Sequence, residues 1–155
     1  MASTDSSTLF LREAARLLTQ QGWRTIDEMP APFDMTLTRE KSTLIVHSRV
    51  VLFFADGDAL SQREMQEAIE QAHALTSEAA TPPLFPATAI VVFMYSDTTP
   101  KEMPENKRNI ARSHATVAWI ANLQTGQLTV HHGVPVIREG KRILEQALHA
   151  LANDG

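Results

Sequence analysis

The sequence has no cysteine, no long apolar stretch and only six glycines. Without cysteine the chain forms neither a disulfide framework nor a thiolate metal site, and it has no cysteine nucleophile. This absence fits a reducing compartment, so we expect a cytoplasmic protein. No run of about 18 apolar residues is present, so we expect no membrane span. The glycines are too scattered for a phosphate-binding loop of the G-x-x-x-x-G-K-[ST] or G-x-G-x-x-G type.

The chain also lacks an excess of basic charge. Fourteen lysine and arginine residues stand against eighteen aspartate and glutamate residues, which gives a formal net charge of −4. Nucleic-acid-binding proteins usually carry a basic excess or a basic stripe, because their affinity comes largely from neutralising phosphates. The short basic clusters at Lys107–Arg112 and Arg138–Arg142 are typical of solvated helix faces. We therefore expect no nucleic-acid partner and favour an unidentified protein partner.

What the chain does have is the length and composition of one globular domain. It has 155 residues, of which 43% are hydrophobic and 21% are charged. The first eight residues, MASTDSST, lack the basic and apolar regions of a secretory signal. We expect a disordered tail over residues 1–8 and a single α/β domain over residues 9–155.

Apolar periodicity predicts the main elements. Helices are expected over residues 9–21, from Ser61 onward, briefly over 107–114, and from about Pro135 to the end. Ser61 and Glu64 have the spacing of a capping box, in which each satisfies a backbone donor of the other. Strands are expected over residues 23–26, 34–40, 42–55, 88–95, 115–121 and 127–131. The run 42–55 is too long for one flat strand, so it predicts either a bend near Ser48 or two strands.

The segment Thr88–Tyr95, TAIVVFMY, shows no polar alternation, which indicates a central strand covered on both faces. Together these patterns predict the α/β fold class, with a mixed β-sheet flanked by helices.

The stretch FDMTLTREKSTLIVHSR, residues 33–49, gives this pattern a resemblance to a known family. The order helix, three strands, helix, strand resembles the αβββαβ core of the PD-(D/E)XK nuclease-like families, over residues 9–95. The resemblance implies a restriction-endonuclease-like core. In those families an acid begins the second strand and a Glu/Asp-x-Lys pair ends the third, and the two carboxylates hold Mg²⁺. Asp34 stands where the first acid would be, and His47 and Arg49 stand where the pair would be.

His47 and Arg49 depart from the family pattern. Imidazole is a poor ligand for Mg²⁺, and a guanidinium group binds anions but does not exchange protons. We expect Asp34, His47 and Arg49 to lie together on one side of a hairpin as candidate ligand-binding residues, with an Asp34–Arg49 ion pair and no hydrolysis. The alternative is that Asp34 only begins a strand and that His47 is a packed core residue. The favoured hypothesis is a non-catalytic binding or regulatory domain, with no metal and no cofactor. The alternatives are a metal-dependent nuclease or phosphodiesterase with an unorthodox Asp34…His47-x-Arg49 site, and an enzyme of another class.

Asp97 is the remaining candidate for ligand binding. It follows the apolar strand that ends at Tyr95, within YSDTTP, and ligands in α/β proteins collect at the carboxyl ends of parallel strands. The alternative is that Asp97 belongs to an ordinary Ser/Asp/Thr turn.

Two further expectations concern partners. The segments REMQEAIEQA (63–72) and FMYSDTTP (93–100) resemble segments of the soluble amino-terminal domain of some bacterial rhomboid proteases. This resemblance implies an accessory module without chemistry of its own.

The strand at Gln127–His131 has few charges to protect a sheet edge, which predicts a homodimer through this hairpin or through the last helix.

Overall fold

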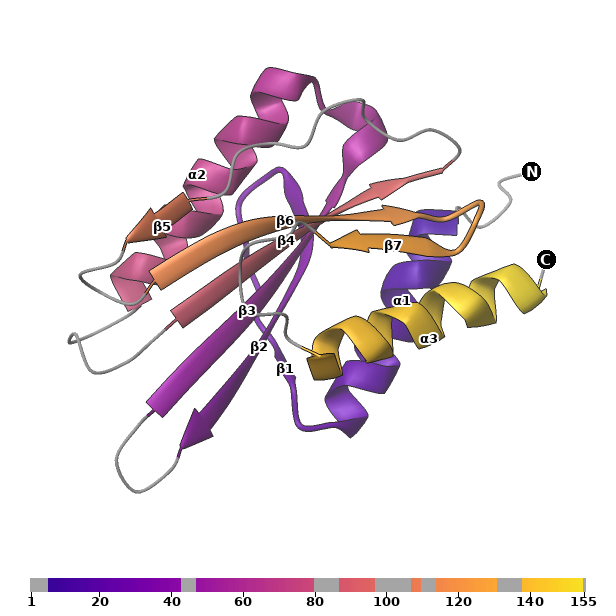
Figure 1. Ribbon diagram of the computed structural model, residues 1–155, viewed down its shortest axis with the longest axis horizontal. Helices are drawn as coiled ribbons and strands as arrows, with labels where there is room; N and C mark the ends of the chain where they lie inside the picture. Colours follow the sequence, from indigo (N-terminus) through magenta and orange to yellow (C-terminus); the bar gives the residue numbers. More distant parts are fainter. Residues whose placement is uncertain are drawn as a thin grey trace.

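The computed structural model describes residues 6–42, 47–79, 87–96, 107–109, 114–130 and 138–154. A central sheet has α1 and α3 on one face and α2 on the other (Figure 1). The helices are α1 (Ser6–Gln20), α2 (Gln62–Ala79), α3 (Arg138–Asp154) and the short 3₁₀ helix η1 (Gly57–Ala59). The strands are β1 (Arg24–Thr25), β2 (Phe33–Ser42), β3 (His47–Asp56), β4 (Ala87–Tyr95), β5 (Lys107–Asn109), β6 (His114–Asn122) and β7 (Gln127–Val130). The predicted α/β class is therefore confirmed.

The sheet is mixed, with the order β1-β2-β3-β4-β6-β5 and with β7 also paired to β6. Strands β1, β2 and β3 form an antiparallel meander, whereas β3, β4 and β6 run parallel to one another. Strands β5 and β7 pair antiparallel with the first and the second half of β6. The carboxyl ends of β3, β4 and β6 therefore lie side by side, and we call this row of strand ends the carboxyl edge. Their first residues form the opposite row of strand ends, the amino edge. The relation to a restriction-endonuclease-like core stays a prediction.

Strand β4 is the interior strand that the sequence predicted. It pairs with β3 on one side and with β6 on the other, and all of its residues except Thr88 are buried. Its alternate side chains belong to two separate apolar clusters, one beneath α1 and α3 and one beneath α2. A strand covered on both faces has no polar side to show, which explains its continuous apolar run.

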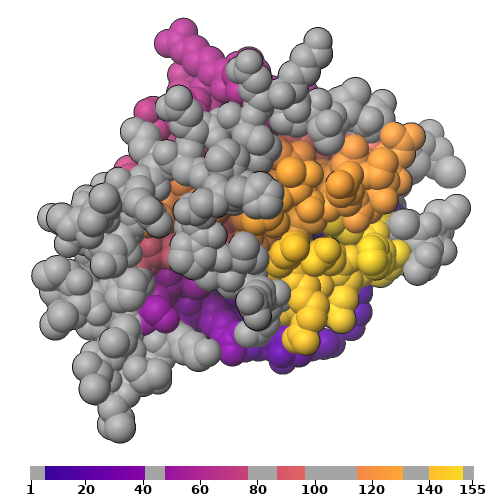
Figure 2. All heavy atoms as spheres, in the orientation of Figure 1, coloured from indigo at the N-terminus to yellow at the C-terminus, as the bar shows by residue number. Residues whose placement is uncertain are grey.

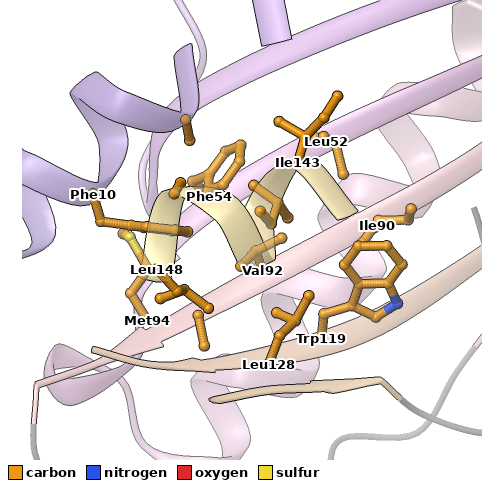
Figure 3. Packing of buried hydrophobic residues seen from close by; sticks show 14 of the residues in the cluster. Phe10, Leu52, Phe54, Ile90, Val92, Met94, Trp119, Leu128, Ile143 and Leu148 are labelled. Carbon is orange, nitrogen blue, oxygen red and sulfur yellow. The ribbon is translucent and has the colours of Figure 1, made fainter. Parts of the chain in front are cut away.

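The cluster beneath α1 and α3 fixes both helices to the sheet (Figure 3). Phe10 of α1 is fully buried, and its ring meets the edge of the Phe54 ring of β3 at a centroid distance of 6.1 Å. From α3, Ile143 and Leu148 join the same cluster. The opposite cluster is built on α2, whose Met65, Ala68, Ile69 and Ala72 are buried.

The capping box at the start of α2 is confirmed. The Glu64 backbone N–H donates to Ser61 Oγ at 3.2 Å, and the Ser61 backbone N–H donates to Glu64 Oε1 at 3.0 Å. Hydrogen bonds from the Ser61 backbone and side chain lower the pKa of Glu64. The helix begins at Gln62, directly after its cap.

Several predicted boundaries are wrong. The helix expected over 107–114 is replaced by β5 and by the start of β6, because pairing along the free side of β6 outweighs local helix propensity. The tail expected over 1–8 is too long, since α1 begins at Ser6.

Of the two alternatives for the long run 42–55, a bent strand or two strands, the structure confirms two strands. Strand β3 is unbroken from His47 to Asp56, while Ser42 ends β2, so the run belongs to two strands and no bend occurs at Ser48. Residues 43–46, and Pro135 with the expected first turn of the last helix, lie outside the described residues. None of the described helices is long and apolar enough to cross a membrane.

Candidate ligand-binding site

A hollow of about 200 Å³ opens at the carboxyl edge of the sheet. It is lined by residues from α1, β3, η1 and β4 and from the segments that follow β4 and β6, namely Ser7, Asp56, Asp58, Met94, Ser96 and Leu123. Parallel strands bring their last residues to one edge, so segments far apart in the sequence meet here. The sequence predicted a ligand-binding residue directly after the central strand β4. Ser96, the first residue after β4, lines the hollow. Asp97 itself lies outside the described residues.

The two carboxylates of the hollow are both held by hydrogen bonds. Asp56 Oδ1 accepts the backbone N–H of Asp58 at 3.1 Å and so caps η1. Asp58 Oδ2 accepts both the backbone N–H of Ser96 at 2.9 Å and the Ser96 hydroxyl at 2.7 Å. Asp58 therefore ties η1 to the end of β4, and the site is set by backbone geometry before any ligand arrives.

Tyr95, the last residue of β4, supports η1 from the α2 side. Its hydroxyl donates to Met65 Sδ at 3.0 Å, and the residue is only 6% exposed. Burial raises the pKa of Tyr95 to about 12, with smaller contributions from the negative charges of Asp58 and Asp56. The ring lies so close to Gly57 that a Cβ at that position would be 2.5 Å from Tyr95 Cε2 and Cζ.

Gly57→Ala should therefore lower the free energy of unfolding by about 1–3 kcal/mol, the usual cost of overpacking a tight site. The ring of Tyr95 cannot move away without breaking its contact with Met65. Urea unfolding followed by circular dichroism measures the loss. Tyr95→Val removes the ring, so Gly57→Ala should cost much less in the Tyr95→Val background. An equal cost in both backgrounds would contradict the proposed clash.

Asp34 lies beside Asp56 at this edge. Phe33 pairs with Ala55 and Met35 with Phe54, so Asp34 is the extra residue of a β-bulge. The residue is exposed, but partial desolvation raises the pKa of its carboxyl group, and the negative charge of Asp56 raises it further. A hydrogen bond from the Asp56 backbone opposes this shift. The bulge thus holds two carboxylates at neighbouring strand ends.

The structure does not bring Asp34, His47 and Arg49 together, which corrects the sequence-based hypothesis. His47 begins β3 and is paired with Ser42, and Arg49 is paired with Glu40. Glu40 is six positions from Asp34, about 20 Å along the strand. The expected Asp34–Arg49 ion pair is therefore wrong.

The error follows from the geometry of a hairpin. Residues that follow a turn lie opposite residues that precede it, so the start of one strand faces the end of the other. Arg49 instead donates through Nε to Thr38 Oγ1 at 3.2 Å, near the amino edge.

In the sequence, Asp56, Gly57 and Asp58 have the composition of an ordinary turn, and Ser7 carries no local signal of a binding site. The available signal was position: Asp56 ends a long β-branched strand that precedes a helix and a second apolar strand, the pattern of a parallel crossover. Applying the strand-end rule to β3 as well as β4 would have identified both aspartates.

The remaining geometric question is whether the site resembles a metal centre. Across the described residues, no three His, Asp or Glu side chains lie close enough together to hold a metal ion.

Comparison with known proteins returns no match for this chain among family models, curated proteins or solved structures.

Proposed function

We propose that the chain is a non-catalytic binding or regulatory domain that takes a small ligand in the hollow at the carboxyl edge. The observation that carries this proposal is the rigid arrangement of Asp56, Asp58 and Ser96 around an open volume of about 200 Å³. A site whose polar groups are already fixed loses little entropy when a ligand binds.

The chemistry of the lining indicates the ligand class. Among the described residues no lysine, arginine or histidine pairs with Asp56 or Asp58, so a bound cation would find two carboxylates. Met94 and Leu123 supply an apolar wall. The volume is below the roughly 300–1,000 Å³ typical of drug-sized ligand sites. These features fit a small ligand with an ammonium group on a short apolar stem.

Titration of 1,3-diaminopropane into the protein, followed by calorimetry and by amide chemical shifts, tests the proposal. We expect saturable binding that Asp58→Asn weakens by about 10- to 150-fold, since one charge-assisted contact is worth about 1.5–3 kcal/mol. Propanol tests the need for the ammonium group and should not bind. Asp27→Asn removes an exposed aspartate outside the hollow and serves as the matched control. Equal weakening by both variants would show charge screening alone and would contradict a specific site.

One observation favours a second candidate, a metal-dependent phosphodiesterase. The nuclease-like families place acids at the start of the second strand and the end of the third, and here Asp34 and Asp56 occupy those ends. Two carboxylates fit the oxygen preference of Mg²⁺. Desolvation raises the pKa of Asp34, the negative charge of Asp56 raises it further, and a divalent ion would offset that charge. Asp58 stands where those families have lysine, so the group that helps to activate water is missing.

Thermal melting with Mg²⁺ and Mn²⁺, alongside cleavage assays on DNA and RNA, separates the two candidates. Metal-dependent stabilisation or cleavage that is lost in Asp34→Asn would favour the phosphodiesterase. Unchanged melting temperatures and no cleavage would leave the binding domain as the function.

A further inference from the structure

The hydrogen bonds of the hollow leave acceptor atoms on three of its side chains. Asp56 accepts the Asp58 backbone N–H through Oδ1, and Asp58 accepts both bonds from Ser96 through Oδ2. The Ser96 hydroxyl donates its only proton to Asp58, so its oxygen can still accept a hydrogen bond. Within the described part of the chain, no hydrogen bond reaches Asp56 Oδ2 or Asp58 Oδ1, and none is donated to Ser96 Oγ.

These acceptor atoms fit a primary ammonium group, which has three N–H donors. A guanidinium group fits less well, because its planar fork pairs best with both oxygens of one carboxylate. Asp58 does not offer that pair, since its Oδ2 already accepts two hydrogen bonds. At Asp56 the Oδ1 atom already accepts one. The hydrogen bonds of the empty site therefore favour a lysine-type group over an arginine-type group.

The rest of the lining restricts the stem that carries the ammonium group. Met94 and Leu123 form an apolar wall, along which a chain of methylene groups can pack. Among the described residues that line the hollow none is aromatic, whereas quaternary ammonium groups are recognised on the faces of aromatic rings. The lining therefore favours an unmethylated ammonium group on an unbranched aliphatic stem, which is the side chain of lysine.

Two observations favour a lysine within a polypeptide over a free amine. The volume of about 200 Å³ accommodates one side chain and leaves the remainder of a larger ligand outside. Asp34 offers that remainder a contact, because it is exposed, lies beside Asp56 and is not part of the lining. Across the described residues Asp34 forms no ion pair, so its charge is available to a second cation.

The hollow is open to a side chain from another molecule. Asp58 and Ser96 are exposed, as are Gln124 and Thr125 in the turn between β6 and β7. This turn, drawn in orange, lies at the molecular surface (Figure 2), and it begins with Leu123 of the lining. A lysine side chain of a partner therefore has access to both carboxylates.

We propose that the hollow binds the unmodified side-chain ammonium group of a lysine on a partner polypeptide, with a neighbouring cation of the same polypeptide on Asp34. This inference rests on the proposed function, because it names the ligand of the same hollow. It gives the binding domain a protein partner. Acetylation or methylation of the bound lysine then releases that partner.

Calorimetric titration with a short blocked peptide in which glycine and lysine alternate tests the proposal, with the amide shifts of Asp58 and Ser96 to locate binding. The probe n-butylamine carries the same stem without a polypeptide. Asp34→Asn should weaken peptide binding by about two- to fivefold, the effect of one exposed ion pair, and should leave n-butylamine unaffected. Asp27→Asn removes another exposed acid and should change neither affinity. If n-butylamine binds as tightly as the peptide, the ligand is a free amine and the proposal is overturned.

Modified peptides test the specificity. Acetylation of the lysines removes the charge and should abolish binding. Trimethylation of the lysines, or their replacement by arginine, should weaken binding by about tenfold or more, because charge-assisted hydrogen bonds are lost. Equal binding of the trimethylated peptide would show that charge alone is read and would overturn the proposal.

Ser96→Ala tests the assignment of the acceptor atoms. It removes the hydroxyl that occupies Asp58 Oδ2, so the preference for the lysine peptide over the arginine peptide should fall severalfold. Gln124→Ala removes an exposed side chain beside the hollow and should leave this preference unchanged. A preference that survives Ser96→Ala unchanged would refute the proposed recognition.

The small-molecule titration separates this inference from the function on which it rests. Binding of 1,3-diaminopropane without binding of the lysine peptide would overturn this inference and leave the proposed function intact. Absence of binding by both probes would overturn both.

Discussion

Phe10→Ala is expected to lower the free energy of unfolding by about 3–5 kcal/mol, a large part of the total stability of a typical domain. The Phe10 side chain is fully buried between α1 and the sheet, and its ring packs edge-on against Phe54. Truncation removes this contact and leaves a cavity that the rigid strand beneath cannot fill. Urea unfolding followed by circular dichroism measures the change.

Leu9→Ala supplies the control for this prediction. Leu9 precedes Phe10 on the same helix but is 38% exposed, so its truncation should change the free energy of unfolding by no more than about 0.5 kcal/mol. Comparable losses in the two variants would show that α1 is not anchored through Phe10. Because Ser7 of α1 lines the hollow, Phe10→Ala should also weaken ligand binding there.

Alkaline pH should destabilise the protein through Tyr95 by about 2–3 kcal/mol. Unfolded tyrosine has a pKa near 10, whereas burial raises the folded pKa of Tyr95 to about 12. The unfolded chain therefore loses its phenol proton first, and stability that is complete below about pH 10 falls until about pH 12. Each pKa unit contributes about 1.36 kcal/mol.

Tyr95 is the sole tyrosine, so phenolate absorbance reports on this side chain directly. The folded protein should ionise near pH 12 and the urea-unfolded chain near pH 10. Tyr95→Phe removes the titrating group, so its unfolding free energy should fall less between pH 10 and pH 12 than that of the unchanged protein. Ionisation near pH 10 in the folded state would show that Tyr95 is solvated and would contradict the packing of its ring on Gly57.

Local patterns in the sequence were sufficient for the elements whose determinants lie close together along the chain. Ser61 and Glu64 identify the start of α2 because a capping box needs only a spacing of three residues. The run from Thr88 to Tyr95 identifies a central strand because burial on both faces removes polar alternation. These features, with the order of helices and strands, determined the α/β class.

Tertiary structure alone decided the features that depend on pairing between distant segments. Residues 107–109 form β5 because a side of β6 is available to them, and no local signal in KRNIARSH reports that partner. The bulge at Asp34 depends on how β2 aligns with β3, and that alignment places Asp34 beside Asp56 and away from Arg49.

The candidate site belongs to this second group. Asp56, Asp58 and Ser96 each look like turn residues in the sequence, since such residues commonly follow strands. They become a site because parallel pairing of β3, β4 and β6 brings three strand ends to one edge, where Asp58 bonds to Ser96 across 38 positions of sequence. Sequence by itself therefore determined the main helices and strands and their order, with the exception of β5, because propensity, capping and burial are local. Strand register decided which polar residues meet. The fold sets this register through contacts between residues that are far apart in the sequence.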